Sequence, residues 1–229
     1  MKYRYKGVIF DLDGTLVDTI EDIAASVNQA LKSRGFPEHN ADEYRSKVGW
    51  GVKRLALLSL PLEIQQNKEE ADKLATEVSK DSSAFYAENP LHYSRSYPGI
   101  TEVLSSLKSL KIKTAVLTNK PDPVAQKVIT GLFPQGSFNY VRGEILGGIR
   151  KPDPECVWEL LLELNLKPSD VIFMGDSEID MECAVAAGCF PLGVDWGYRD
   201  KNTILAGGAR RIIHKAEELI EFFPKGVFV

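Results

Sequence analysis

Short apolar runs that alternate with helical patterns constrain the fold of this chain more than any other feature. The runs occupy residues 8–10, 115–117, 171–174 and 192–194. Such runs are typical of strands in a parallel sheet that helices cover on both faces, so the sequence predicts an α/β fold. Near the C-terminus, Ile212 and Ile213 predict an edge strand, and residues 217–223 predict a closing helix.

A long helical insertion follows the first run. About a hundred residues separate the first run from the second, and a crossover helix needs far fewer. Apolar residues at spacings of three and four predict helices over 20–31, 52–60 and 62–87. We therefore expect a Rossmann-like core, residues 1–17 and 91–229, and an inserted α-helical cap domain, residues 18–90. The linkers are expected near 17–19 and 89–97.

Charge and composition exclude several classes of partner. The 229 residues carry 28 Lys and Arg against 32 Asp and Glu, a net charge of −4, and the basic residues are scattered. Nucleic acids and anionic membranes select clustered basic residues, so we expect neither as a partner. We find no signal-peptide pattern and no apolar run of about 18 residues, and the three cysteines fit no metal-binding spacing. We expect a cytoplasmic protein, either a monomer or a homodimer.

Two aspartates follow the first apolar run directly. The segment Asp11-Leu12-Asp13-Gly14-Thr15 comes immediately after Phe10. Ligands of open parallel sheets bind at the carboxyl ends of the strands, and strand alternation points Asp11 and Asp13 toward the same side. Two close carboxylates oppose each other's ionisation unless a cation joins them, which predicts a hard metal ion such as Mg²⁺. A simple turn explains Asp13-Gly14 but does not explain Asp11.

A second acidic motif follows the run at 171–174. Gly175 permits a tight exit from the strand, Asp176 lies at its tip, and Asp180 comes about one helical turn later. Alternatively, Asp176 or Ser177 serves merely as the cap of the next helix. The interpretation that these aspartates belong to a metal site is favoured, because Asp11 and Asp13 already require a counter-ion.

Two further segments supply groups that bind anions. Thr118-Asn119-Lys120 comes after the second run and offers a hydroxyl and backbone N–H groups, and Lys151 lies in a loop stiffened by two prolines. Each segment alone is a weak signal, because a turn or a solvated lysine explains it equally well. Combined with the acidic motifs, they provide a cation site beside an anion site, which is what phosphoryl transfer requires.

These segments, in this order, resemble the motifs of the haloacid dehalogenase superfamily, in its phosphatase branch with a helical cap. The resemblance rests on DLDGTLVDT at 11–19, Thr118-Asn119, the Lys151-Pro152-Asp153-Pro154 loop and the Gly175-Asp176 to Asp180 motif. It covers nearly the whole chain. It implies a hydrolase that uses Mg²⁺ and acts on a small phosphorylated metabolite.

The resemblance implies a role for each of the catalytic and anion-binding residues. Asp11 would be the nucleophile that forms an aspartyl-phosphate. Asp13 would protonate the leaving alcohol and then deprotonate the attacking water. Thr118 and Lys151, with Asn119 beside them, would bind the phosphoryl group.

The resemblance also implies a metal shell. Mg²⁺ would bind Asp11, the backbone carbonyl of Asp13 and Asp176, and Asp180 would steady this shell. The dehalogenases of the superfamily lack the acid at the position of Asp13, and the phosphonate hydrolases have a small residue there. Both reactions are therefore disfavoured for this chain.

The cap segment Gly49-Trp50-Gly51-Val52-Lys53-Arg54 is similar to the corresponding segment of phosphoglycolate phosphatases. Lys53 or Arg54 would then bind a substrate carboxylate, and Trp50 would exclude water. Alternatively, the segment only connects two helices, and both cations are solvated. The residues favour neither interpretation over the other.

The preferred interpretation is a phosphatase similar to phosphoglycolate phosphatases. A sugar-phosphate mutase similar to β-phosphoglucomutase, or a pyrophosphatase, remains open on the same scaffold. The alternative from another class is a non-catalytic phosphate-binding regulatory protein. Tyr198 and Arg199 follow the last run and receive no catalytic role.

Overall fold

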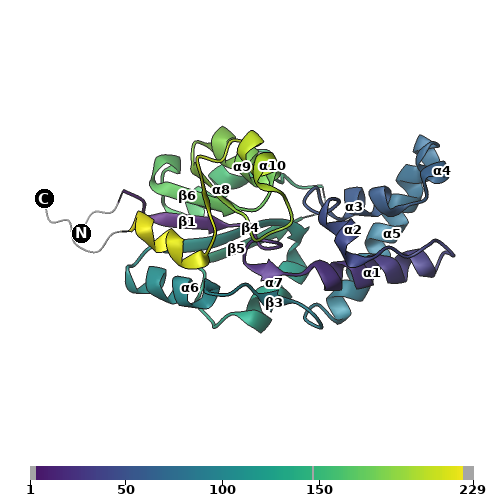
Figure 1. Cartoon of the computed structure of the whole chain (residues 1–229), viewed down its shortest axis with the longest axis horizontal. Coiled ribbons are helices and arrows are strands. Elements are labelled where there is room, and N and C mark those ends of the chain that lie inside the picture. The colour runs from purple at the N-terminus through teal and green to yellow at the C-terminus, as the bar shows by residue number, and fades with distance from the viewer. Residues whose placement is uncertain (1–3, 146, 224–229) are drawn as a thin grey trace, which may run out of the picture.

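The computed structural model describes residues 4–145 and 147–223 and has a parallel sheet at its centre (Figure 1). The strand order is β5-β4-β1-β6-β7-β8, and every neighbouring pair is parallel. The strands span Gly7–Phe10 (β1), Lys113–Pro121 (β4), Tyr140–Glu144 (β5), Val171–Gly175 (β6), Phe190–Val194 (β7) and Arg211–Ile213 (β8). The predicted α/β fold is confirmed, and the Ile212–Ile213 strand forms the end of the sheet.

Helices cover both faces of this sheet. On one face, Ile9 and Phe173 share an apolar cluster with residues of α8 and α9, and on the other face Phe10 and Met174 share one with residues of α6 and α7. The helices are α6 (Ile100–Ser109), α7 (Asp122–Leu132), α8 (Glu155–Leu164), α9 (Glu178–Ala187) and α10 (Lys201–Ala206), with short 3₁₀ helices η1 (Pro168–Asp170) and η2 (Ala216–Phe222). In Figure 1, α8, α9 and α10 lie above the sheet and α6 lies below it. Burial on both faces explains why the central strands are continuously apolar.

The remaining helices gather at one end of the sheet, where they form the cap (Figure 1). They are α1 (Ile20–Lys32), α2 (Ala41–Arg45), α3 (Val52–Ser59), α4 (Leu62–Gln65) and α5 (Lys68–Glu88). Helices α1 and α3 both pack against the long helix α5. Buried side chains such as Val27, Leu55 and Val78 fill the space among them. The exact limits of the core and cap, with a cap of 18–90, stay a prediction.

Two antiparallel segments join the cap to the sheet. Strand β2 (Val17–Asp18) pairs with β3 (Arg95–Ser96), within the segments where the sequence predicts the linkers. The buried carboxylate of Asp22 accepts hydrogen bonds from the backbone N–H groups of Tyr93 and Ser94 and from the Ser94 hydroxyl, at 2.6–3.1 Å. Asp22 thereby ties the second linker to the first turn of the cap.

The cap differs from its predicted pattern at two places. Helix α2 was not predicted, because its five residues are too few to show a period; the Asn40 and Glu43 capping box is its sequence signal. The predicted helix at 62–87 is two helices, α4 and α5. The side chain of Asn67 accepts a hydrogen bond from the N–H of Glu70 and begins the second one.

The core also differs from its predicted pattern. Strand β5 was not predicted, because this edge strand is partly exposed and shows no apolar run. Strand β4 continues to Pro121, so Thr118, Asn119 and Lys120 lie within the strand and not beyond its end. The closing segment near 217–223 is helical as expected, but it is the 3₁₀ helix η2.

Replacing Asp22 by alanine should destabilise the protein by about 2–4 kcal/mol. The change leaves the buried N–H and hydroxyl of Ser94 and the backbone N–H of Tyr93 without their acceptor, and hydrogen bonds to charged groups contribute about 1.5–3 kcal/mol each. Urea unfolding measures the loss. Glu21→Ala, at an exposed neighbouring position, is the control and should stay within about 0.5 kcal/mol. Equal stabilities of the two variants would contradict the role assigned to Asp22.

Candidate active site

Three aspartates meet at the carboxyl ends of the two central strands. Asp11 follows β1, Asp176 follows β6, and these strands are hydrogen-bonded neighbours. Asp180 reaches the same point from the first turn of α9. Carboxylate oxygens of the three residues lie within 4.8 Å of one another, and all three side chains are buried. The structure therefore brings together acids that are separated by as many as 169 positions in the sequence.

The environment opposes ionisation of Asp11 and Asp176. Burial raises the pKa of Asp11 well above its ordinary value; the ammonium of Lys151 acts against this shift, while Asp180 and Asp176 add to it. Burial, reinforced by the charge of Asp180, raises the pKa of Asp176 to about 7. A cluster of buried oxygen ligands that repel one another fits a hard divalent cation such as Mg²⁺. The predicted ligands Asp11 and Asp176 belong to this cluster.

Close backbone packing holds Asp176 in place. Its carboxylate accepts hydrogen bonds from the Thr15 hydroxyl, at 3.0 Å, and from the backbone N–H of Tyr198, at 2.7 Å. Gly14 has a φ of +82°, and a Cβ at this position would lie 2.3 Å from a carboxylate oxygen of Asp176. Glycine is therefore required at position 14 for both its conformation and its size.

Lys151 supplies positive charge to this cluster. Its Nζ donates to Asp11 Oδ1 at 2.7 Å and to Asp180 Oδ1 at 2.6 Å. Although burial opposes the charge of Lys151, the carboxylates of Asp11 and Asp180 raise its pKa. Asp180 also accepts from the backbone N–H and the hydroxyl of Ser177, so it holds Lys151 and the start of α9 together. The role expected for Asp180, to steady the metal shell, stays a prediction.

Asn119 and Thr118 have different surroundings. The Asn119 amide accepts from the backbone N–H of Lys151 at 3.0 Å and donates to the carbonyls of Lys151 and Gly49 at 2.9 Å each. Asn119 thus positions the Lys151 loop and a cap loop. It also lines the pocket, and its place beside the phosphoryl group stays a prediction. Thr118 lines the pocket, and its hydroxyl oxygen accepts from the N–H of Lys120.

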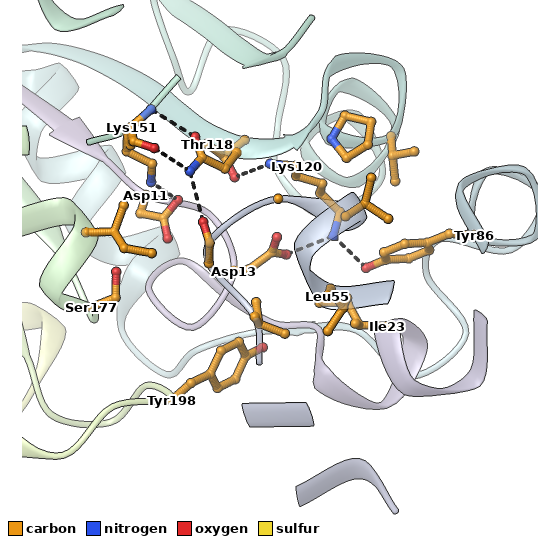
Figure 2. A pocket seen from close by; sticks show the side chains of 18 of the residues that line it. Asp11, Asp13, Ile23, Leu55, Tyr86, Thr118, Lys120, Lys151, Ser177 and Tyr198 are labelled. Carbon is orange, nitrogen blue, oxygen red and sulfur yellow. Dashed lines mark hydrogen bonds and ion pairs between the residues drawn. The ribbon is translucent and has the colours of Figure 1, made fainter. Parts of the chain in front are cut away.

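Asp13 is held by groups that sequence reasoning did not single out. Its Oδ1 accepts from the Thr19 hydroxyl at 2.6 Å and from Lys120 Nζ at 2.9 Å. Lys120 Nζ also bonds to the hydroxyl of Tyr86, on cap helix α5, at 2.9 Å, and Figure 2 shows it between the two residues. Burial opposes the charge of Lys120, but Asp13 and Tyr86 raise its pKa. The Lys120 side chain therefore links the cap to Asp13.

The loop after β7 forms a second link between core and cap. Tyr198 bonds through its hydroxyl to Thr19. Arg199 Nε pairs with Glu178 at 3.1 Å, and its guanidinium donates to the backbone carbonyls of Val48, at 2.6 Å, and Arg45. Arg199 had no predicted catalytic role, because carbonyls more than 150 positions away leave no local signal in the sequence.

A pocket lies between these core groups and the cap. Its cap side is mainly apolar, and Tyr86 and two serines of α5 also line it; the apolar residues are Ile23, Val27, Val48, Val52 and Leu55. The described lining does not include Trp50, Lys53 or Arg54. Lys53 pairs instead with Asp72 at 2.8 Å, and Trp50 is 39% exposed. The backbone of Gly49 and Gly51, and not the neighbouring cations, faces the pocket.

This fold and this cluster of acids define a known class of enzymes, and the chain belongs to the haloacid dehalogenase-like hydrolase family, whose model matches residues 8–194. It is 34% identical over 196 residues to the phosphoglycolate phosphatase of Aquifex aeolicus (strain VF5), covering 86% of this chain and 87% of that protein. It is also 34% identical over 203 residues to the phosphoglycolate phosphatase of Mannheimia succiniciproducens, covering 86% and 89%.

A solved structure agrees with these relatives. The crystal structure of a predicted phosphoglycolate phosphatase from Haemophilus somnus 129pt superposes with a TM-score of 0.85 at 27% identity. The match covers 96% of this chain and 99% of that one. Within residues 4–145 and 147–223, we find no helix long and apolar enough to cross a membrane.

Mg²⁺ should stabilise the protein more at pH 8 than at pH 6. The pKa of Asp176 is about 7 in the folded metal-free protein, against an ordinary value of 3.8. Between these two pH values, the folded protein keeps the Asp176 proton and the unfolded chain releases it. Stability of the metal-free protein should therefore fall as the pH rises from about 4 to about 7, and below pH 7 a cation must displace the proton. At about 100 times its Kd, Mg²⁺ adds about 2.7 kcal/mol, or roughly 5–10 °C in Tm.

Thermal melts with and without Mg²⁺ at both pH values measure this effect. Asp176→Asn, which removes the charge and keeps the size, should lose most of the stabilisation by Mg²⁺. An equal Tm shift at pH 6 and pH 8, or a full shift in the variant, would contradict the assignment of Asp176 to the cation site.

Proposed function

We propose that this chain is a Mg²⁺-dependent phosphatase that hydrolyses a small phosphate monoester through an aspartyl-phosphate on Asp11, with 2-phosphoglycolate as the model substrate. The observation that carries the proposal is the buried acidic cluster, with Lys151 bonded to Asp11, at the pocket. The names of the relatives from Aquifex and Mannheimia support the substrate class. These names do not favour the mutase, pyrophosphatase or non-catalytic alternatives.

In the first half of the proposed reaction, an oxygen of Asp11 attacks the phosphorus atom and the bond to the ester oxygen breaks. Lys151, 2.7 Å from Asp11, favours the ionised form of this carboxylate against the effect of burial, and it attracts the phosphoryl oxygens. The Thr118 hydroxyl retains a hydrogen that it can donate to one of those oxygens. Mg²⁺, when bound, supplies the positive charge that allows an anionic phosphoryl group to approach carboxylates.

The donor set for this cation consists of Asp11, Asp176 and the backbone carbonyl of Asp13. Asp180 supports it by holding Lys151 and Ser177, as its hydrogen bonds indicate. All these ligand atoms are oxygen, which is the preference of Mg²⁺.

Asp13 is the general acid and then the general base of the proposed reaction. It protonates the leaving oxygen when the ester bond breaks, and it later takes a proton from the water that attacks the aspartyl-phosphate. The hydrogen bond from Thr19, at 2.6 Å, orients the Asp13 carboxyl for both steps. Closure of the cap over the pocket excludes other water, which would compete for the intermediate.

Asp11→Asn should lower kcat for release of phosphate from 2-phosphoglycolate by at least about 10³-fold, because an amide is a poor nucleophile. Asp13→Asn should lower kcat by about 10²- to 10⁴-fold, because general acid-base catalysis is lost. Phosphate release in the presence of Mg²⁺ is the measurement.

The matched control is Glu21→Gln, the same carboxylate-to-amide change on an exposed face of α1. It should keep the activity of the natural sequence. Full activity of Asp11→Asn, or no phosphate release by the unchanged protein from any of a panel of small phosphate esters, would overturn the proposed function.

A further inference from the structure

We infer that Lys120 selects substrates with an anionic leaving group, and that this group replaces Asp13 as the partner of the Lys120 ammonium. The inference rests on the proposed function and deepens it, since it concerns the same pocket. In Figure 2, the Lys120 side chain lies between Asp13 of the core and Tyr86 of the cap.

Lys120 differs from the other cations among the described lining residues in how firmly it is held. Lys151 is bonded to two carboxylates, and Arg199 is bonded to Glu178 and to two backbone carbonyls of the cap. The carboxylate partner of Lys120 is Asp13, its other partner is the neutral hydroxyl of Tyr86, and an ammonium has three donors. Lys120 is therefore the cation best able to take a new anionic partner.

The proposed chemistry brings the leaving group to this ammonium. The ester oxygen must come within about 2.7 Å of the Asp13 carboxyl to receive its proton. Lys120 Nζ is 2.9 Å from Asp13 Oδ1, so an ester oxygen that bonds this same Oδ1 is within about 6 Å of Nζ. A carboxylate one methylene group beyond the ester oxygen, as in 2-phosphoglycolate, spans this gap.

Burial makes the exchange of partners selective. Lys120 is 6% exposed, and a buried charge without a partner is strongly unfavourable. A substrate carboxylate gives Lys120 a new partner and releases Asp13 to bond the leaving oxygen. A neutral leaving group offers no such replacement, so Lys120 stays on Asp13 and competes with the leaving oxygen.

The mainly apolar cap side of the pocket supports the same assignment. The cap cations Lys53 and Arg54 are absent from the described lining. Besides Lys151, which is assigned to the phosphoryl group, the cations of the described lining are Lys120 and Arg199. Arg199 already has its own partners, so Lys120 is the cation left for a substrate carboxylate that enters beside Ile23 and Leu55.

The test compares 2-phosphoglycolate with ethyl phosphate, whose leaving group is neutral and of similar size. Lys120→Met keeps most of the side-chain length and removes the charge. We expect it to lower kcat/KM for 2-phosphoglycolate by about 10²- to 10³-fold and to change kcat/KM for ethyl phosphate by less than about 10-fold, so the preference for the anionic ester collapses. Lys120→Arg should keep most of that preference.

The matched control is Lys108→Met, the same change at an exposed position of α6, which should leave both constants unaltered. Equal losses on both esters in Lys120→Met would reduce Lys120 to a structural residue and overturn the inference. If Lys120→Met melts below the assay temperature, the comparison of Lys120→Gln with Lys120→Arg decides, since the two differ in charge. Failure of the proposed function is distinct, because the unchanged protein would then hydrolyse neither ester.

Discussion

The ion pairs of Lys151 with Asp11 and Asp180 are the interactions on which the rest of the site depends. They join the end of β1, the loop before α8 and the first turn of α9, which are far apart in the sequence. Removing one partner of a buried pair leaves an uncompensated charge, which costs about 3–5 kcal/mol. Asn119 fixes the backbone of Lys151 on both sides, so the position of the ammonium is set by β4 as well.

The cap is held to this site mainly through its backbone. Arg199 donates to the carbonyls of Arg45 and Val48, and Asn119 donates to that of Gly49. These hydrogen bonds to the loop do not depend on its side chains, and Lys53 and Arg54 are absent from the described lining. Lys120 adds a contact of another kind, because its partner Tyr86 lies on the cap and its partner Asp13 lies in the core.

The parts of this site that follow a strand directly could be predicted from the sequence. Asp11, Asp13 and Asp176 lie next to apolar runs, and the rule that ligands bind at the carboxyl ends of parallel strands places them together. The side-chain role of Lys120 could not be predicted, because its partner Asp13 is 107 positions away and β4 continues further than its apolar run indicates. The prediction for the cap cations relied on a local resemblance and stays a prediction; in the structure Lys53, on the helix that begins at Val52, pairs with Asp72.

Charge balance explains why these residues depend on one another. Asp11, Asp13, Asp176 and Asp180 face two ammonium groups, those of Lys120 and Lys151, so full ionisation leaves two uncompensated negative charges in a buried region. Burial, with repulsion among these carboxylates added to it, raises the pKa values of Asp11 and Asp176. A divalent cation removes the excess, and a substrate that is anionic at both ends then needs positive charge at two places. Under the proposed function, Lys151 and the cation would serve the phosphoryl end and Lys120 the other end. The mild acidity of the chain is therefore compatible with selection of an anionic substrate.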